Sequence, residues 1–490
     1  MCTGCVQSGM AAADSLGLDP LASKFIAIGA TAVMLFGAIT PLANPTTQVK
    51  AGAVCVKANQ KVVQSGKTFV CKKSGKKLVW KVQKKKVSQA PTTTPAEPEK
   101  TPAEQIQYQD PSIPSKDVAL CKIREANNSR LWGGMTGAGF PAFNSMTPRF
   151  GTMRWALIPI DFPDLPGESD FKSRVTGQME LLSDWFDTVS DGKFKVEWVL
   201  HDSWVRLPNP SSQYSIPRSV NLRDAPNGEK LFTEAMRAAD PEFNFSNIQT
   251  VNFLLPKGQI FMTETSQGFP WDDAVKRLTT NEGRIASFAT PGLFMDHPQA
   301  EYWSYWAHEF GHAIGLPHVG SSRGELPPFN PFDLMGGQDG PTRELSGWLR
   351  FIAEWLPDEN VYCLPADDVS NLELTLIPLI ERKPGVRFVI IPTSSTKAIM
   401  IESRRSTKFS CGPKNKNGVL VYEYDAQLGH GENFLIPIVP TGRSKLNVPG
   451  CRVGPFADPL LYQGNSLTTS GLKIEVIKVA NMDQIRISRS

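Results

Sequence analysis

Three histidines and one glutamate of this 490-residue chain lie close together, in the order His308, Glu309, His312 and His318. On an α-helix, His308 and His312 stand one turn apart on the same face, so both imidazoles can bind one metal ion. Gly315 can adopt the positive φ that ends a helix, which would return His318 as a third nitrogen ligand. Three histidines leave the fourth tetrahedral position of a zinc ion open for water, as in catalytic zinc sites.

The combined pattern is more specific than its parts. A histidine at a helix end is usually a structural or surface residue, and His-x-x-x-His alone is weak evidence. The other histidines, His201, His297 and His430, are scattered, and we expect each to be structural or on the surface rather than a ligand. We expect Glu309 to be the general base, because its helical position directs it past the metal toward the bound water.

The string His-Glu-x-x-His-x-x-Gly-x-x-His over residues 308–318 resembles the signature of the metzincin clan of zinc endopeptidases. Members of that clan carry a methionine on a tight turn under the metal, and Met335 within Phe332–Gly337 matches it. The resemblance implies that the three histidines bind one zinc ion, that Glu309 is catalytic and that Met335 gives structural support.

The surrounding segments predict an α+β fold. Residues 154–162 read as a buried strand, and residues 171–186 have apolar positions at spacings of three and four, typical of an amphipathic helix that backs a sheet. We expect further elements before the zinc helix: strands at 193–207, 250–256 and 284–289, and a helix at 228–239. This order predicts a metzincin-like zinc-peptidase domain over residues 111–360, with a twisted mixed sheet, a backing helix and a zinc helix.

Short alternating segments predict a β-sandwich-like C-terminal domain over residues 361–490. The expected strands lie at 372–379, 386–391, 398–402, 418–424, 473–479 and 484–488. This domain has no catalytic constellation, and we expect it to seat substrate or to cover the catalytic domain.

Several segments resemble the immune-inhibitor-A-like family of secreted bacterial metallopeptidases over about residues 150–485. These segments are Ile160–Asp164, Ser190–Phe194, Leu345–Arg350 with Trp355, Glu402–Arg404 and Gly418–Tyr422. The third ligand of that family is usually an aspartate, whereas this chain has His318. The resemblance to the clan is therefore closer than the resemblance to the family.

The N-terminal residues are typical of an exported protein. The apolar run 25–42, preceded by Lys24, resembles a signal-peptide core, so we expect residues 1–43 to be a leader. Its length also fits an uncleaved membrane anchor. We therefore expect a secreted or cell-surface-associated protein. Cys2 and Cys5 have no second pair nearby, and we assign them no function.

Residues 44–86 predict a small basic β module closed by a disulfide. Twelve lysines and no acidic residue lie between residues 50 and 86. The whole chain has a net charge of +4, so the residues outside this range have a net charge of −8. This charge would attract an anionic cell-wall polymer or a membrane surface, and a solvated basic spacer is the alternative. Residues 87–110 are rich in proline and threonine, which predicts a linker.

Six cysteines remain after the leader, and an even number indicates disulfides in an exported chain. Cys55 and Cys71 should pair within the basic module. The other four allow three pairings: Cys121, Cys363, Cys411 and Cys451. Proximity in the sequence favours Cys363 with Cys411. Residues 111–150 could also form a pro-segment in which Cys121 caps the zinc, although a disulfide is favoured.

The expected function is that of a secreted zinc endopeptidase acting on protein or peptide substrates. We expect one catalytic zinc ion; a structural calcium ion is compatible with this class, but no Asp-rich loop requires one. We expect no nucleic-acid partner and a monomer. Two alternatives stay open: an inactive relative that binds at the cell surface, and a zinc hydrolase directed at a non-peptide bond such as a cell-wall amide.

Overall fold

The computed structural model describes residues 50–64, 67–75, 77–82, 105–127, 137–141, 147–216, 226–262, 266–268, 279–298, 300–320, 329–338, 340–411, 416–452 and 454–490. Contacts divide these residues into a small unit before residue 103 and a large unit from there to residue 490. The predicted leader, with Cys2 and Cys5, lies outside the described residues. Within the described part of the chain, no helix has the length and apolarity needed to cross a bilayer.

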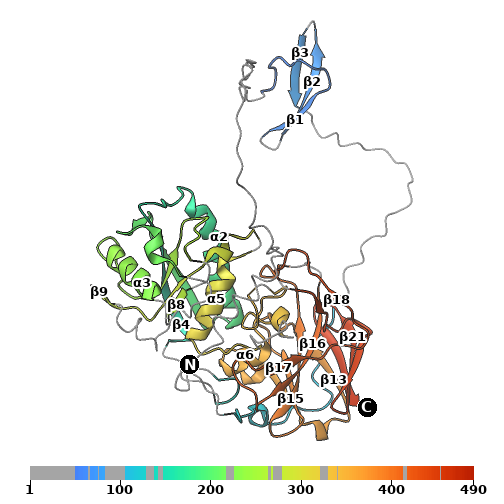
Figure 1. Ribbon diagram of the computed structural model, residues 1–490. Helices are drawn as coiled ribbons and strands as arrows, with labels where there is room; N and C mark the ends of the chain where they lie inside the picture. Colours follow the sequence, from blue (N-terminus) through green and yellow to red (C-terminus); the bar gives the residue numbers. More distant parts are fainter. Residues whose placement is uncertain are drawn as a thin grey trace, which may run out of the picture. The chain divides into compact units, whose positions relative to one another are not determined.

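The small unit is an antiparallel sheet of three strands (Figure 1). They are β1 (Lys61–Gln64), β2 (Lys67–Ser74) and β3 (Lys77–Val82). Its core contains Phe69 and Trp80 beside the disulfide between Cys55 and Cys71, which confirms the predicted pair. So small a core buries little apolar surface, and the disulfide adds stability by restricting the unfolded chain.

A mixed sheet forms the first half of the large unit. Its strands are β4 (Gly151–Asp161), β5 (Phe194–Leu200), β6 (Val205–Arg206), β7 (Ile248–Leu254), β8 (Ser266–Gly268) and β11 (Ser287–Thr290). The strand order is β5-β4-β7-β11-β8, with β6 beside the end of β4. The pairs of β4, and the pair of β7 with β11, are parallel, whereas β8 runs antiparallel to β11.

Helices cover both faces of this sheet (Figure 1). They are α2 (Phe171–Val189), α3 (Pro226–Ala239) and α5 (Tyr302–Ala313). In β4, Trp155 and Leu157 join the core that contains α2 and α5, whereas Ala156 and Ile158 join the core that contains α3. Successive residues of a strand point to opposite faces, so the run from Trp155 to Ile160 in β4 is apolar on both sides because both faces are covered. The predicted backing helix is confirmed as α2.

The segment predicted as one strand at 193–207 is divided. β5 ends at Leu200, and β6 begins at Val205 further along β4. Between them the ring of Trp204 packs against Phe171, with 5.2 Å between the centroids. The prediction of a single strand was wrong, because side-chain packing interrupts a pattern that reads as continuous in the sequence.

The C-terminal part consists of two sheets that share one core, as predicted for a sandwich. One sheet contains β12 (Val361–Cys363), β14 (Phe388–Pro392), β15 (Lys397–Arg404), β16 (Gly418–Asp425) and β17 (Leu435–Pro437). The other contains β13 (Asn371–Leu376), β20 (Ser466–Thr469), β21 (Leu472–Val479) and β22 (Asp483–Arg489). All six predicted strands are present.

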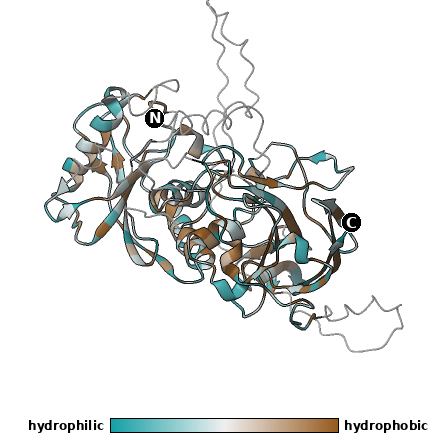
Figure 2. Cartoon of the chain, turned by 90° about the horizontal axis from the view of Figure 1, so that it is seen from below, coloured by the Kyte–Doolittle hydropathy of each residue, from teal (hydrophilic) through white to brown (hydrophobic). Residues whose placement is uncertain are grey.

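The first of these sheets is buried on both faces. In β15, Ile399 and Ile401 face the partner sheet, whereas Ala398 and Met400 join the core around α5 and the helix α6 (Gly347–Ile352). This second contact joins the sandwich to the first half in one compact unit. Figure 2 shows hydrophobic residues concentrated in the central helices and strands of this unit. The division at residue 360 stays a prediction.

The residues before β4 pack on the sandwich. Ile106, inside the range assigned to the linker, is 6% exposed and its N–H donates to Asn481. Further along, Lys116 N–H donates to the carbonyl of Cys363. Residues 105–110 are therefore part of the packed unit, because apolar side chains there find a partner surface. Residues 87–104 lie outside the described part of the chain.

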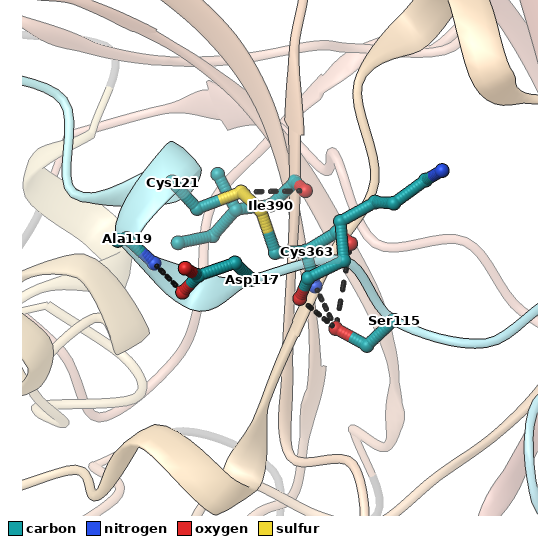
Figure 3. The surroundings of a disulfide bond; sticks show 7 residues. Ser115, Asp117, Ala119, Cys121, Cys363 and Ile390 are labelled. Atoms are coloured by element: carbon teal, nitrogen blue, oxygen red, sulfur yellow. Dashed lines mark hydrogen bonds between the residues drawn. A yellow bond between two sulfur atoms is a disulfide. The ribbon is translucent and has the colours of Figure 1, made fainter.

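The disulfides of the large unit join Cys121 to Cys363 and Cys411 to Cys451. Figure 3 shows the first, between the short helix over Val118–Cys121 and β12. The predicted Cys363–Cys411 pair was wrong, because proximity in sequence does not decide which strands and turns meet in space. The favoured disulfide of Cys121 is confirmed, and this residue does not cap the metal site.

Candidate metal centre

The helix α5 presents the first two histidines from a rigid position. It is buried along nearly its whole length, and Phe310 packs against Trp155 at 4.4 Å and against Phe194 at 5.7 Å between ring centroids. The helix ends at Ala313, and Gly315 follows with a φ of 98°. The positive φ expected of Gly315 is thus present, and it turns the chain back toward the helix.

This turn brings the three predicted histidines together. His308 Nε2 lies 3.0 Å from His318 Nε2, and His312 Nε2 lies 2.8 Å from the same atom. One ring nitrogen from each histidine lies within 4.8 Å of the other two. All three rings are buried, with 1% to 8% of the residue surface exposed. His201 and His297 are not part of this cluster.

The donor set fits a metal ion. His308 Nδ1 lies 2.7 Å from the carbonyl of Leu334, and His312 Nδ1 lies 2.9 Å from the carbonyl of Leu316. A carbonyl only accepts hydrogen bonds, so both Nδ1 atoms carry the ring proton and both Nε2 atoms direct lone pairs at His318. His318 can donate a single Nε2 proton to only one of them. A cation between the three nitrogens satisfies all of them, and Zn2+ commonly binds neutral imidazole in this way.

The electrostatic environment keeps the histidines neutral. Burial lowers the pKa of His308 to about 4. Burial and the neighbouring histidines lower the pKa values of His312 and His318 well below the usual value. Metal ions bind the unprotonated imidazole nitrogen, so these shifts favour the metal-binding form at neutral pH.

Glu309 lines a small pocket between α5 and the strands β7 and β11. Polar side chains of Thr250, Asn252 and Ser287 line the same pocket. Burial raises the pKa of Glu309 to about 8. A cation held by the adjacent histidines would lower this pKa again, because a nearby positive charge favours the carboxylate. The environment of Glu309 therefore suits a group that takes up and releases a proton near neutral pH.

Met335 lies directly beneath α5. A Cβ placed on Gly311 would lie 2.5 Å from Met335 Sδ, so the helix approaches the methionine where it has no side chain. The preceding Leu334 carbonyl holds His308, and the Met335 carbonyl accepts from Val319 N–H at 3.3 Å. The turn around Met335 thus contacts both sides of the cluster.

A buried aspartate shapes this turn. Asp333 Oδ1 accepts from Met335 N–H, and its Oδ2 accepts from Ser346 N–H, each at 2.7 Å. Burial raises the pKa of Asp333 to about 6; the hydrogen bonds from Ser346 and Met335 oppose this shift, and the Arg404 guanidinium opposes it less strongly. Arg404 is itself buried and pairs with Glu402 of the sandwich. The hydrogen bonds from Met335 and Ser346 to Asp333 therefore hold the turn under the cluster.

The structure adds a fourth histidine that sequence analysis did not connect to the site. His318 N–H donates to His430 Nδ1 at 3.2 Å, and the two ring centroids are 4.9 Å apart. The ring of His430 also lies 5.8 Å from that of His312. His430 adjoins the cluster without joining the ligand set. The only signal in the sequence is its position between Gly429 and Gly431, which indicates a turn.

Comparison with known proteins gives only weak similarities. No protein-family model matches the chain, and no curated protein matches it. Metalloproteinase-II from Bacteroides fragilis is 16% identical with a TM-score of 0.25, over 45% of this chain and 58% of that chain. OgpA from Akkermansia muciniphila is 14% identical with a TM-score of 0.26, over 59% and 87%. These similarities are too low to assign a family, so function has to be inferred from the site itself.

Proposed function

We propose that this chain is an exported zinc-dependent endopeptidase that hydrolyses peptide bonds. The observation that carries the proposal is the convergence of the Nε2 atoms of His308, His312 and His318, with the partly buried Glu309 next to His308 on the same helix. Three neutral imidazoles leave one position of a tetrahedral zinc ion for water, which is the arrangement of catalytic sites.

Zinc bound there would supply a Lewis acid that acidifies its water and polarises the scissile carbonyl. The residues of the chain perform the proton transfers. Glu309 takes the proton of the attacking water and delivers it to the nitrogen of the leaving amine, as general base and then general acid. His308 and His312 keep their orientation because their Nδ1–H groups donate to backbone carbonyls.

The test is cleavage of a quenched peptide library by the purified chain. We expect activity to stop with a chelator and to return with added zinc. Glu309→Gln should lower kcat/KM by about 100- to 10,000-fold, the usual contribution of a general base, while zinc stays bound. Glu242→Gln, at an exposed position, is the control. Cleavage that persists in Glu309→Gln, or without metal, would contradict the mechanism.

The same experiment separates the alternatives. An inactive surface-binding relative would bind cell walls and cleave no peptide. A hydrolase directed at cell-wall amides would release fragments from purified walls in a zinc-dependent reaction but leave the peptide library intact. The intact set of ligands and the intact Glu309 favour peptide hydrolysis over the first alternative. A structural calcium ion and a monomeric state stay predictions.

We further propose that the small unit holds the enzyme at an anionic cell-wall polymer. In the register of its sheet, Lys61 and Lys81 both pair with Val70, and Lys72 follows on the same face. All three lysines are exposed. Clustered cations on one face attract a polyanion more strongly than the same charges spread around the module.

Adjacent lysines of β2 supply a matched comparison. Lys72→Ser, on the lysine face, should weaken retention on teichoic acid at low salt more than Lys73→Ser, on the opposite face of the same strand. If the two variants lose the same amount of retention on teichoic acid, the module is a solvated basic spacer. Binding to vesicles of phosphatidylglycerol, with none to teichoic acid, would indicate a membrane surface instead.

A further inference from the structure

The loop between β16 and β17 of the sandwich contacts the third histidine of the cluster. His318 N–H donates to His430 Nδ1 at 3.2 Å, and Gly431 N–H donates to the His318 carbonyl at 2.9 Å. Two adjacent residues of one turn therefore bind both backbone polar groups of His318. We propose that this Gly429–Glu432 turn positions His318 for the metal, so that the C-terminal sandwich completes the metal site. The inference rests on the metal site proposed above.

His318 needs such support more than the other two histidines. The helix α5 fixes His308 and His312, whereas His318 lies beyond Gly315 in a segment without regular structure. Its neighbour Val319 is held from one side by the Met335 carbonyl. The Gly429–Glu432 turn holds His318 by a second set of bonds. A ligand outside regular structure keeps its geometry only through tertiary contacts of this kind.

The turn itself is braced. The Glu432 carboxylate accepts from Gly429 N–H at 2.8 Å, and Glu432 N–H donates to the Gly429 carbonyl at 3.0 Å. Gly431 has a φ of 73°, which a residue with a Cβ rarely adopts. On the other side, Asn127 Nδ2 donates to the carbonyls of Ala426 and Leu428, at 3.2 and 2.9 Å. The turn is therefore tied to the segment that precedes the mixed sheet.

The hydrogen bond from His318 defines what position 430 must supply. Because Nδ1 of His430 accepts from a backbone N–H, that atom has no proton, and a neutral ring carries its proton on Nε2. His430 thus acts on His318 through Nδ1, the ring nitrogen that lies nearer its own backbone. Asparagine places an oxygen near the position of Nδ1, whereas glutamine places its polar atoms near Nε2. If His430 positions His318 through Nδ1, asparagine should replace it. If His430 acts through Nε2, glutamine should replace it.

The experiment compares zinc affinity in the full-length chain with residue 430 as His, Asn, Gln or Ala, by competition with a chromophoric chelator. Loss of an outer contact to a metal ligand usually weakens metal affinity about 10- to 100-fold, and we expect that loss in His430→Ala and His430→Gln. His430→Asn should restore most of the affinity. The visible spectrum of the Co2+-loaded protein should change in the same order. His201→Ala, at a histidine remote from the cluster, should leave both readouts unchanged.

Equal zinc affinity and Co2+ spectra in wild type and His430→Ala would overturn the proposal, as would rescue by Gln but not by Asn. Asn127→Ala, which loosens the turn without contacting His318, should also weaken zinc binding, and this variant keeps the test open if His430→Ala does not fold. Zinc affinity is measured without turnover. A chain that binds zinc but cleaves nothing would therefore refute the peptidase and leave this inference standing, whereas a chain that binds no zinc would overturn both.

Discussion

Gly311 and Met335 share one space beneath the metal cluster: a Cβ on Gly311 would lie 2.5 Å from Met335 Sδ and 3.0 Å from its Cε. Both residues are buried. Gly311 lies between the two helical histidines, and the Leu334 carbonyl next to Met335 accepts from His308. The size of residue 311 therefore sets how closely the methionine turn approaches the helix and its first ligand.

Gly311→Ala should destabilise the protein and weaken zinc binding. In an open helix this change gains about 1 kcal/mol, but the added methyl group overlaps with Met335, and overpacking costs about 1 to 3 kcal/mol. Met335→Ala removes the overlap, so the double variant should lose less stability than the two single changes together. Urea unfolding measures the stability of the single and double variants, and competition with a chromophoric chelator measures their zinc affinity. Gly177→Ala in α2, where no atom lies within 4 Å of the new Cβ, should be neutral or stabilising. Strict additivity of Gly311→Ala and Met335→Ala would show that the two residues do not interact.

Glu309→Gln should change how the stability of the metal-free protein depends on pH. Burial raises the pKa of Glu309 from 4.5 to about 8, so between these values the folded state holds a proton that the unfolded state has lost. Stability therefore falls as pH rises through this window. The lowered pKa of His308 makes stability rise with pH instead, but only between about pH 4 and pH 6.5.

Between pH 6.5 and 8, of these two groups only Glu309 changes the free energy of unfolding in this way. At 1.36 kcal/mol per pH unit, the loss of stability over this range is at most about 2 kcal/mol. Urea unfolding in chelator should show a decline over this range in wild type that is smaller in Glu309→Gln. Identical slopes in the two proteins would mean that Glu309 is already ionised in the folded chain.

Asp191→Asn should loosen the contact between the mixed sheet and the sandwich. Asp191 lies in the turn before β5 with a φ of 54°, and its carboxylate pairs with both terminal nitrogens of Arg387, whose side chain is 1% exposed. Asparagine tolerates this backbone conformation but leaves the guanidinium charge unpaired, at a cost of about 3 to 5 kcal/mol. Asp187→Asn is the control, because Asp187 and Arg382 are each about 40% exposed and a surface pair contributes at most about 1 kcal/mol. If Asp191→Asn and Asp187→Asn have the same urea midpoint, the Asp191–Arg387 pair does not stabilise the protein more than the surface pair does.

The two disulfides of the large unit should differ in their effect on stability. Cys121–Cys363 spans 242 residues and Cys411–Cys451 spans 40. On the chain-entropy account, removing them costs about 5.5 and about 4 kcal/mol, because the longer loop restricts the unfolded chain more. Paired Cys→Ala variants measured by urea unfolding test the order. Peptide mapping under non-reducing conditions tests the connectivity, and a peptide that joins Cys363 to Cys411 would contradict it.

Local patterns determined much of what sequence analysis could predict. The spacing of His308 and His312 fixes their common face, because a helix repeats every 3.6 residues. Gly315 signals the turn that returns His318, because few other residues adopt its φ. Alternation of apolar residues located the strands of the sandwich, and Cys55 and Cys71 pair across a short loop. In each case the residues concerned are neighbours along the chain, so their geometry follows from local backbone rules.

Tertiary structure alone decided the relationships between distant residues. His318 and His430 are separated by 112 positions, and no period or motif connects them. The partner of Cys363 proved to be Cys121 rather than the nearer Cys411, because the segment before the mixed sheet runs along β12. Trp204 interrupts a strand pattern because it packs on Phe171. The sequence alone determined which side chains can bind a metal, and the packing of the sandwich decided what holds the third of them in place.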